Sequence, residues 1–226
     1  MVALFVAFMF VSLVLVDLSM EKWKVWQASR SAQAALAHAM FMPQGLWRIP
    51  DGVQISNAHT WFRPDPAGGL EIGADALIAY AVGAVRKIVL PKPGDHVSKG
   101  QPLFRLVHNG AIMTVPSSVT GRVMAVNTRL AEEPQLLSAD PYGNGWICYV
   151  KPTLDEKPAL FTRLGADARA WLDNEFGRFR DFVLTQASPE LAVGATSQDG
   201  GLPAAGCLGE LSPETWSSFE DQFLSQ

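Results

Sequence analysis

The sequence predicts a β-rich α+β fold, in which a small β-sandwich with short helices lies between one N-terminal transmembrane helix and a set of C-terminal helices. Three observations support this prediction. The first 20 residues are almost entirely apolar, residues 45–152 contain short β-prone runs separated by glycine and proline, and helical periodicity returns after residue 152. A length of 226 residues suits one modest domain with appendages rather than two full cores.

The N-terminal segment reads as a membrane anchor. Residues 2–18 (VALFVAFMFVSLVLVDL) reach the lower end of the roughly 17 to 25 residues that span a bilayer. The run lacks the basic n-region of a cleaved signal peptide and is longer than a typical h-region. Basic residues follow the run and none precedes it, so the positive-inside rule predicts an extracytoplasmic N-terminus and a cytoplasmic domain. We therefore expect residues 1–20 to span the inner, or cytoplasmic, membrane once. The expected membrane-interface residues are Trp23, Trp26, Lys22 and Lys24.

A helical stalk is expected between this anchor and the domain. Residues 21–44 consist mostly of good helix formers up to Pro43. Proline is a common signal for the end of a helix. We therefore expect the spanning helix to continue as a stalk before the β-rich region begins.

The β-rich region, residues 45–152, contains one strong turn signal. Its β-prone runs include GLEIG, RKIVLPKPGD, GQPLFRLVHNG, AIMTV and GRVMAV. Asn109 and Gly110 separate two of these runs, and both central residues of a type I′ turn need a positive φ, which Asn-Gly tolerates best. We therefore predict a tight hairpin with its tip at these two residues. Residues 74–84 (ADALIAYAVGA) predict one short helix packed on the sandwich.

Four segments of this region occur in the order of one known family. They are IPDGVQISNAHTWFRPD, GLEIGADALIAYAVGAVRKIVLPKPGDHVSKGQPL, SSVTGRVMAVNTRL and EEPQLLSADPYGNGWICYVKP. Together they resemble the H protein of the glycine cleavage system over roughly residues 47–152. The GD-x-V-x-x-G turn occurs throughout lipoyl and biotinyl domains, whereas His59-Thr60-Trp61 and residues 140–146 (DPYGNGW) are closer to H proteins alone. The resemblance implies a lipoyl-type flattened β-barrel or sandwich with a few helices, in which one hairpin tip normally carries lipoate on a lysine.

The sequence departs from that family at the hairpin tip. Residues 119–121 (VTG) match the family's Val-Ser-Gly, and counting back from them places the lipoyl-lysine position at Gly110. The family's glutamate three residues earlier corresponds to Val107. The family's chemistry is therefore predicted to be missing at two matched positions.

No other amine lies nearby to replace that lysine. No lysine occurs between Lys99 and Lys151, and lipoylation requires an amine that can form an amide. Neither His108 nor Arg105 offers an equivalent group. His108 could instead be a metal or proton ligand, although a lone histidine on a hairpin is more often simply exposed. We therefore predict no lipoyl group and no other cofactor.

The residues after the domain predict an amphipathic helix region and a linker. Within residues 153–186, five apolar side chains follow helical spacing and should pack on the sandwich or on a partner, with core packing favoured. They are Trp171, Leu172, Phe176, Phe179 and Val183. Residues 187–211 are rich in Gly, Ala, Ser and Pro with almost no periodicity, which is typical of a linker.

A terminal amphipathic helix is expected over residues 212–226. Ser212 and Pro213 provide an N-cap and a favourable first helical residue. Trp216, Phe219 and Phe223 share one face and are candidates for partner binding. Such a helix can fold back on its own domain or dock in the groove of another protein, and the sequence leaves the two alternatives open.

Several functional classes are excluded or disfavoured. A net charge of −4 argues against nucleic acid as a partner. Cys148 and Cys207 lie far apart without metal-ligand spacing, so no disulfide scaffold, redox pair or metal site is predicted. No nucleophile and base pair and no phosphate-binding loop is apparent, and His59, Asp95 and His96 are separate residues. The protein is therefore not expected to be an enzyme.

The remaining prediction is a non-catalytic module in a membrane. The favoured role is a scaffold or accessory subunit, with the lipid bilayer and other subunits of a membrane complex as partners. An electron-transfer or photosynthetic complex is a guess that no residue supports. The alternative is a carrier or adaptor related to aminomethyl or lipoyl transfer that acts without its own lipoyl group.

Overall fold

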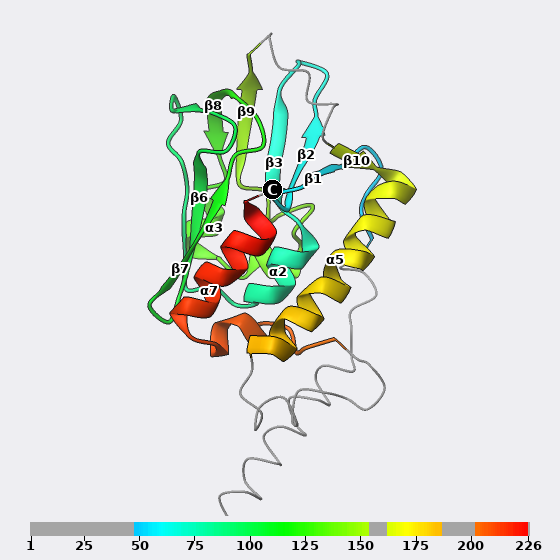
Figure 1. Cartoon of the computed structure of the whole chain (residues 1–226). Coiled ribbons are helices and arrows are strands. Elements are labelled where there is room, and N and C mark those ends of the chain that lie inside the picture. The colour runs from blue at the N-terminus through cyan, green and yellow to red at the C-terminus, as the bar shows by residue number, and fades with distance from the viewer. Residues whose placement is uncertain (1–47, 154–161, 187–201, 226) are drawn as a thin grey trace, which may run out of the picture. The chain divides into compact units, whose positions relative to one another are not determined.

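The computed structural model describes residues 48–153, 162–186 and 202–225 (Figure 1). The expected anchor and stalk lie outside these residues, as do the predicted interface residues Trp23, Trp26, Lys22 and Lys24. Within the described ranges, no helix is both long enough and apolar enough to cross a membrane.

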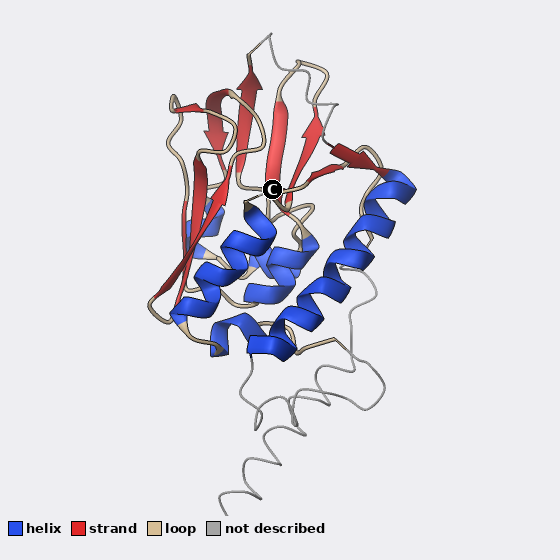
Figure 2. Cartoon of the chain, in the orientation of Figure 1, coloured by secondary structure: helices blue, strands red, loops and turns tan. Residues whose placement is uncertain are grey.

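Ten strands in the described residues form two antiparallel sheets, as the β-rich prediction requires (Figures 1 and 2). The strands are β1 (Gln54–Ser56), β2 (Thr60–Pro64), β3 (Leu70–Ala74), β4 (Lys87–Val89), β5 (His96–Val97), β6 (Pro102–His108), β7 (Ala111–Pro116), β8 (Gly121–Val126), β9 (Cys148–Pro152) and β10 (Thr162–Leu164). The seven-stranded sheet has the order β10-β1-β2-β3-β9-β8-β5, and the three-stranded sheet has the order β4-β6-β7. Strand β10, which pairs with β1, was not predicted.

The core lies between these sheets and the helices. Alternation along β7 buries Ala111, Met113 and Val115 while Ile112 faces solvent, so one face of the strand is apolar and covered. Trp61 and Phe62 on β2 are also buried. The alternation along β7 has the period of two that a half-buried strand requires.

The predicted short helix is present as α2 (Ala76–Val82), and all seven of its residues are buried. Asp75 is its N-cap, and its Oδ1 accepts hydrogen bonds from the backbone N–H groups of Leu77 and Ile78. Gly83 ends the helix with φ +63. Two further short helices, α3 (Arg129–Glu132) and α4 (Leu136–Ala139), were not predicted.

The predicted amphipathic helix is α5 (Gly165–Gln186). Four members of its predicted stripe, Leu172, Phe176, Phe179 and Val183, are buried, and Trp171 is half-buried. The helix contacts α2, β1 and β10. Core packing, the favoured interpretation of the stripe, is therefore what the structure shows.

The terminal helix begins as predicted. Helix α7 (Pro213–Phe219) follows Ser212, whose Oγ accepts a hydrogen bond from the backbone N–H of Thr215. A π-helical turn, η3 (Glu220–Leu224), continues it. The end of the segment predicted as a linker is structured. It contains a 3₁₀ turn, η2 (Cys207–Glu210), which packs against α2.

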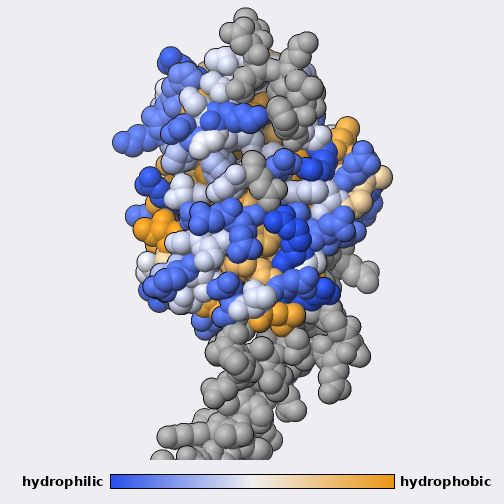
Figure 3. All heavy atoms as spheres, viewed as in Figure 1, coloured by the Kyte–Doolittle hydropathy of each residue, from blue (hydrophilic) through white to orange (hydrophobic). Residues whose placement is uncertain are grey.

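The partner-binding candidates on this helix are core residues. Trp216, Phe219 and Phe223 are at most 1% exposed, and the two phenylalanine rings stack with centroids 4.6 Å apart. Phe179 and Phe182 of α5 complete the aromatic cluster with edge contacts. The prediction of these three residues as partner contacts is corrected accordingly, since their side chains are enclosed by the chain's own aromatic rings. The surface seen in Figure 3 is mostly hydrophilic with small separate apolar patches.

Candidate functional site

The hairpin tip has the predicted geometry. His108 pairs with Ala111, which leaves a two-residue loop between β6 and β7. Asn109 has φ +45 and Gly110 has φ +84, the pair of positive values that a type I′ turn requires. The predicted tip is confirmed.

No side-chain amine is present at this tip. A Cβ placed on Gly110 would have no atom within 4 Å, so space for a side chain exists there and the backbone conformation is the restriction. Val107 is half-buried on the strand before the turn. The hairpin therefore presents a backbone turn with two adjacent peptide groups and no group that could form an amide with lipoate.

The C-terminal segment covers one face of the hairpin. The ring of His108 stacks on Trp216 with centroids 6.4 Å apart and an interplanar angle of 9°. A Cβ on Gly209 would lie 2.9 Å from His108 Nε2, so glycine permits this approach. The Trp216 indole N–H donates to the Leu208 carbonyl at 2.7 Å. Within the described chain, His108 Nδ1 has no hydrogen-bond partner, and the ring serves as a packing surface.

The same segment also reaches the edge of the sheet. The backbone N–H of Thr114 on β7 donates to Glu220 Oε1 at 2.7 Å. Strand β7 is the last strand of its sheet, and an unpaired edge offers backbone groups to other chains. Glu220 therefore satisfies one donor on an edge that would otherwise invite pairing.

A close backbone approach between Gly206 and the C-terminal end of α2 positions the C-terminal segment. The N–H of Gly206 donates to the Tyr80 carbonyl of α2 at 2.7 Å. A Cβ on Gly83 would lie 2.6 Å from the Cα of Gly206, a distance that side-chain carbons do not tolerate. Gly83 and Gly206 both have positive φ, so glycine is needed for conformation as well as for space.

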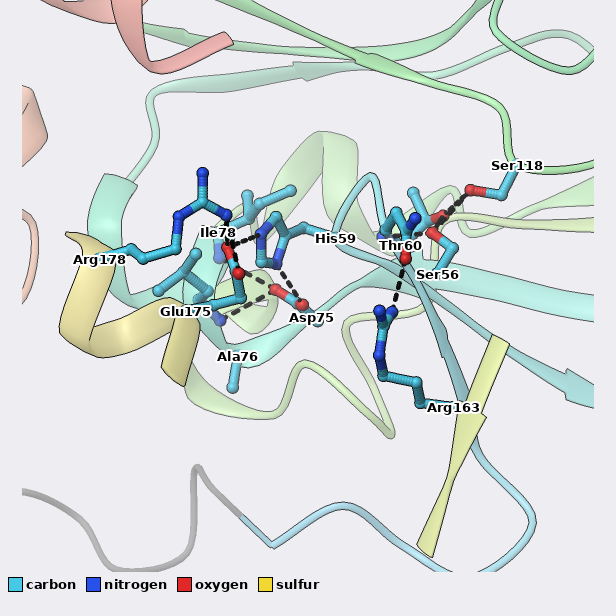
Figure 4. Close-up of polar contacts among 12 residues, drawn as sticks. Ser56, His59, Thr60, Asp75, Ala76, Ile78, Ser118, Arg163, Glu175 and Arg178 are labelled. Atoms are coloured by element: carbon cyan, nitrogen blue, oxygen red, sulfur yellow. Dashed lines mark hydrogen bonds and ion pairs between the residues drawn. The ribbon is translucent and has the colours of Figure 1, made fainter. Parts of the chain in front are cut away.

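A buried ionic cluster lies at the N-terminal end of α2 (Figure 4). His59 is fully buried, and its Nδ1–H donates to Asp75 Oδ2 at 2.7 Å. Its Nε2 lies 3.5 Å from Glu175 Oε2, an ion-pair distance that is too long for a good hydrogen bond. Arg178 donates to both oxygens of Glu175 at 2.7 and 2.8 Å. Trp171 stacks on the His59 ring at 4.8 Å.

These neighbours favour a charged imidazole. Burial lowers the pKa of His59, but Asp75 and then Glu175 outweigh it and raise that pKa to about 9. Burial raises the pKa of Glu175, but its contacts with His59 and Arg178 bring it below its usual value. The cluster therefore holds two cations and two carboxylates in balance at neutral pH. His59 is also held at φ +56, which is rare outside glycine.

The geometry of this cluster supports a structural role. It joins the β1–β2 turn, the N-terminus of α2 and helix α5, and Arg178 extends it to the Gln222 carbonyl at 3.2 Å. His59 is 0% exposed and Glu175 is 4% exposed, so a substrate has no access to them in this structure. Buried groups of this kind fix the position of α5 against the domain.

The motif residues that resemble H proteins also have structural roles. The Thr60 hydroxyl lies 2.5 Å from that of Ser118, and the Trp61 indole donates to the Pro141 carbonyl at 2.8 Å. The Tyr142 hydroxyl accepts from the N–H of Ala76 at 3.1 Å. In the DPYGNGW turn, a Cβ on Gly143 or Gly145 would come within 3 Å of Asp140 atoms. These contacts explain why the motif needs aromatic residues and glycine at these positions.

The cysteines and remaining candidates form no reactive site. Burial raises the pKa of Cys148 and that of Cys207 to about 12, so both remain thiols at neutral pH. Asp95 and His96 are exposed. In the part of the chain that the structure describes, no cluster of three or more His, Cys, Asp or Glu residues could hold a metal ion.

Comparison with known proteins relates this arrangement to one family. The family model described as Glycine cleavage H-protein matches residues 53–167, half of the chain. The glycine cleavage system H protein of Bifidobacterium longum is 35% identical over 114 residues, covering 50% of this chain and 81% of that protein. The H protein of Chromobacterium violaceum is 32% identical over 104 residues, covering 46% of this chain and 81% of that protein. A crystal structure of the Mycobacterium marinum H protein covers 56% of this chain and 99% of that chain at 25% identity, with a TM-score of 0.48.

The family match ends at residue 167, so most of α5 and all of η2, α7 and η3 lie beyond it. The matched part contains all the strands of both sheets, and it does not contain the C-terminal segment that packs on the hairpin. On the extent of that match and on the identity of these relatives, the chain belongs to the glycine cleavage H-protein family.

Proposed function

We propose that this chain is a non-lipoylated, non-catalytic member of its family that acts as a membrane-anchored scaffold or accessory subunit of a membrane protein complex. The hairpin carries this proposal. Its tip is a type I′ Asn-Gly turn, and no lysine occurs between Lys99 and Lys151. Lipoate is held through an amide to an amine, so a carrier arm has no attachment point at this tip.

The C-terminal cover supports the same proposal. Trp216 and Gly209 pack on His108, the residue directly before the turn, and Glu220 binds the edge strand. The hairpin is thus fixed on one face by a segment that lies beyond the family match. A hairpin held in this way suits a rigid module better than a carrier whose arm must move between sites.

The membrane anchor is supported by the sequence. Residues 2–18 are almost entirely apolar, and the nearest lysines follow the run. Alkaline carbonate washing of membranes tests the anchor, with the full-length chain expected in the pellet. Release of the full-length chain, or a mature N-terminus near residue 40, would contradict it.

Intact-mass measurement tests the absence of lipoate. The chain is co-expressed with a lipoate ligase, and no mass gain of one lipoyl group is expected. A lipoylated H protein from the same cells provides the positive control. Any lipoyl adduct on the chain, mapped by peptide fragmentation, would overturn the proposal.

Family membership favours one alternative. The relatives are named as H proteins of the glycine cleavage system, so this chain could take part in aminomethyl or lipoyl transfer without its own lipoyl group. Gly110→Lys restores an amine at the matched position and is the discriminating variant. Lipoylation of that variant, together with growth of a strain that lacks its normal H protein, would favour the carrier role. Lipoylation without growth would favour the scaffold.

A further inference from the structure

The outer face of the three-stranded sheet combines cations with exposed apolar side chains. Strand register places Lys87, Val107 and Ile112 opposite one another in one row. The next row on the same face contains Val89, Arg105 and Thr114. Alternation between faces then assigns Ile88, Leu106 and Met113 to the inner face, where all three are buried.

The apolar residues of this outer face protrude into solvent. Ile112 is 55% exposed and Val89 is 38% exposed, while Val107 between them is half-buried. Lys87 and Arg105 lie in the same two rows and are also exposed. Single exposed apolar residues are ordinary, but three on adjacent strands beside two cations make a defined surface.

Positive and negative charges are distributed unevenly along the chain. Residues 84–128 contain six lysines and arginines and one acidic residue, Asp95, in a protein whose net charge is −4. The described C-terminal residues 202–225 have no lysine or arginine and four acidic residues. Two of these cations, Lys87 and Arg105, lie on the strands that form this surface, which bear no acidic residue.

We propose that the outer face of β4, β6 and β7 docks on an anionic lipid bilayer. Cations that attract acidic headgroups and β-branched side chains that enter the headgroup region are the two components of a peripheral membrane surface. The inference rests on the proposed membrane anchor, which would tether the domain to the bilayer.

A domain that is tethered to a membrane needs only a weak affinity for the bilayer in order to dock on it. Each lysine or arginine near an anionic bilayer increases binding about fivefold, so two cations would give about 25-fold. That is too little to capture a free soluble protein at cellular concentration. An anchor raises the effective concentration of the bilayer to roughly millimolar values, at which weak contacts become occupied. Two cations are therefore enough for this face to bind a bilayer to which the chain is tethered.

The test uses the full-length chain reconstituted in vesicles of phosphatidylcholine, with or without phosphatidylserine at roughly one part in three. Ile112→Cys carries an environment-sensitive fluorophore, in a Cys207→Ala background because Cys148 is buried. Brominated lipids should quench this fluorophore in vesicles that contain phosphatidylserine. Leu164→Cys on β10 is the matched control, since Leu164 is 54% exposed but lies on the other sheet, and it should not be quenched.

Charge variants sharpen the result. Lys87→Gln with Arg105→Gln should lower the docked-to-undocked ratio about 25-fold, and 1 M salt should have a similar effect because it shortens the Debye length to about 3 Å. Equal quenching at both positions, or no quenching at residue 112, would overturn the inference. Protection of residue 112 only when other membrane-complex subunits are added would assign the face to a protein and overturn it too. Flotation separates the two proposals, since a chain that fails to float with pure phosphatidylcholine vesicles lacks the anchor whatever residue 112 shows.

Discussion

The two faces of the β4-β6-β7 sheet differ in almost every respect. The inner face is buried, and the aromatic segment that packs on its strand β7 contains acidic residues and no basic ones. The outer face is exposed and carries Lys87 and Arg105 beside Ile112. Both faces are formed by the same short strands, so substitutions one residue apart probe different properties. The inner face should control stability, and the outer face should control what the protein contacts.

The largest expected effect is on the inner side. Phe219→Ala should lower the free energy of unfolding by about 3 to 5 kcal/mol, because it leaves a cavity beside Phe179, Phe182 and Phe223. Denaturant unfolding measures this change. Ile112→Ala on the outer face is the control and should stay within about 0.5 kcal/mol. Comparable losses for the two variants would remove the distinction between the faces.

A second, smaller effect should depend on pH. The pKa of His59 is raised in the folded chain to about 9 from an ordinary 6.5, so its stabilising charge is complete below pH 6.5 and is lost as the pH rises through 9. The free energy of unfolding should fall by about 3 kcal/mol across this range. His59→Asn, which tolerates the positive φ, should abolish that slope. Melting curves from pH 6 to about 9.5 measure it, and an unchanged slope in the variant would assign the dependence to other groups.

The smallest of the three effects concerns the tip that joins β6 and β7. Gly110→Val should cost on the order of 1 kcal/mol or more, because a β-branched side chain is strained at φ +84 although the space around it is open. Asn109→Gly keeps the turn type and should change stability by only a few tenths of a kcal/mol. An unchanged melting temperature for Gly110→Val would show that the turn rearranges at little cost.

Local signals in the sequence were sufficient for some elements. The Asn-Gly turn, the cap of α7 at Ser212 and the stripe on α5 depend on residues that are close in sequence, and the structure contains all three. The surface on which Trp216 packs could not be predicted, because a helical stripe shows that one side is apolar without specifying its neighbour.

The ionic cluster was missed for the same physical reason. His59 meets Asp75 and Glu175, which come from positions 16 and 116 residues further along the chain. No periodicity or spacing connects them, and His59 alone reads as an ordinary strand residue. Asp75 carried the one local signal, an acidic residue before a short apolar helix, which is typical of an N-cap.

The contact between Thr114 and Glu220 joins residues 106 positions apart. Because domains form from the N-terminus during synthesis, both sheets can assemble before α7 and η3 have left the ribosome. The aromatic core of Phe179, Phe219 and Phe223 is complete only after that segment has been synthesised and has folded back onto α5. Until then the nascent chain exposes the apolar inner face and an open strand edge, and this interval is when it most needs protection by chaperones.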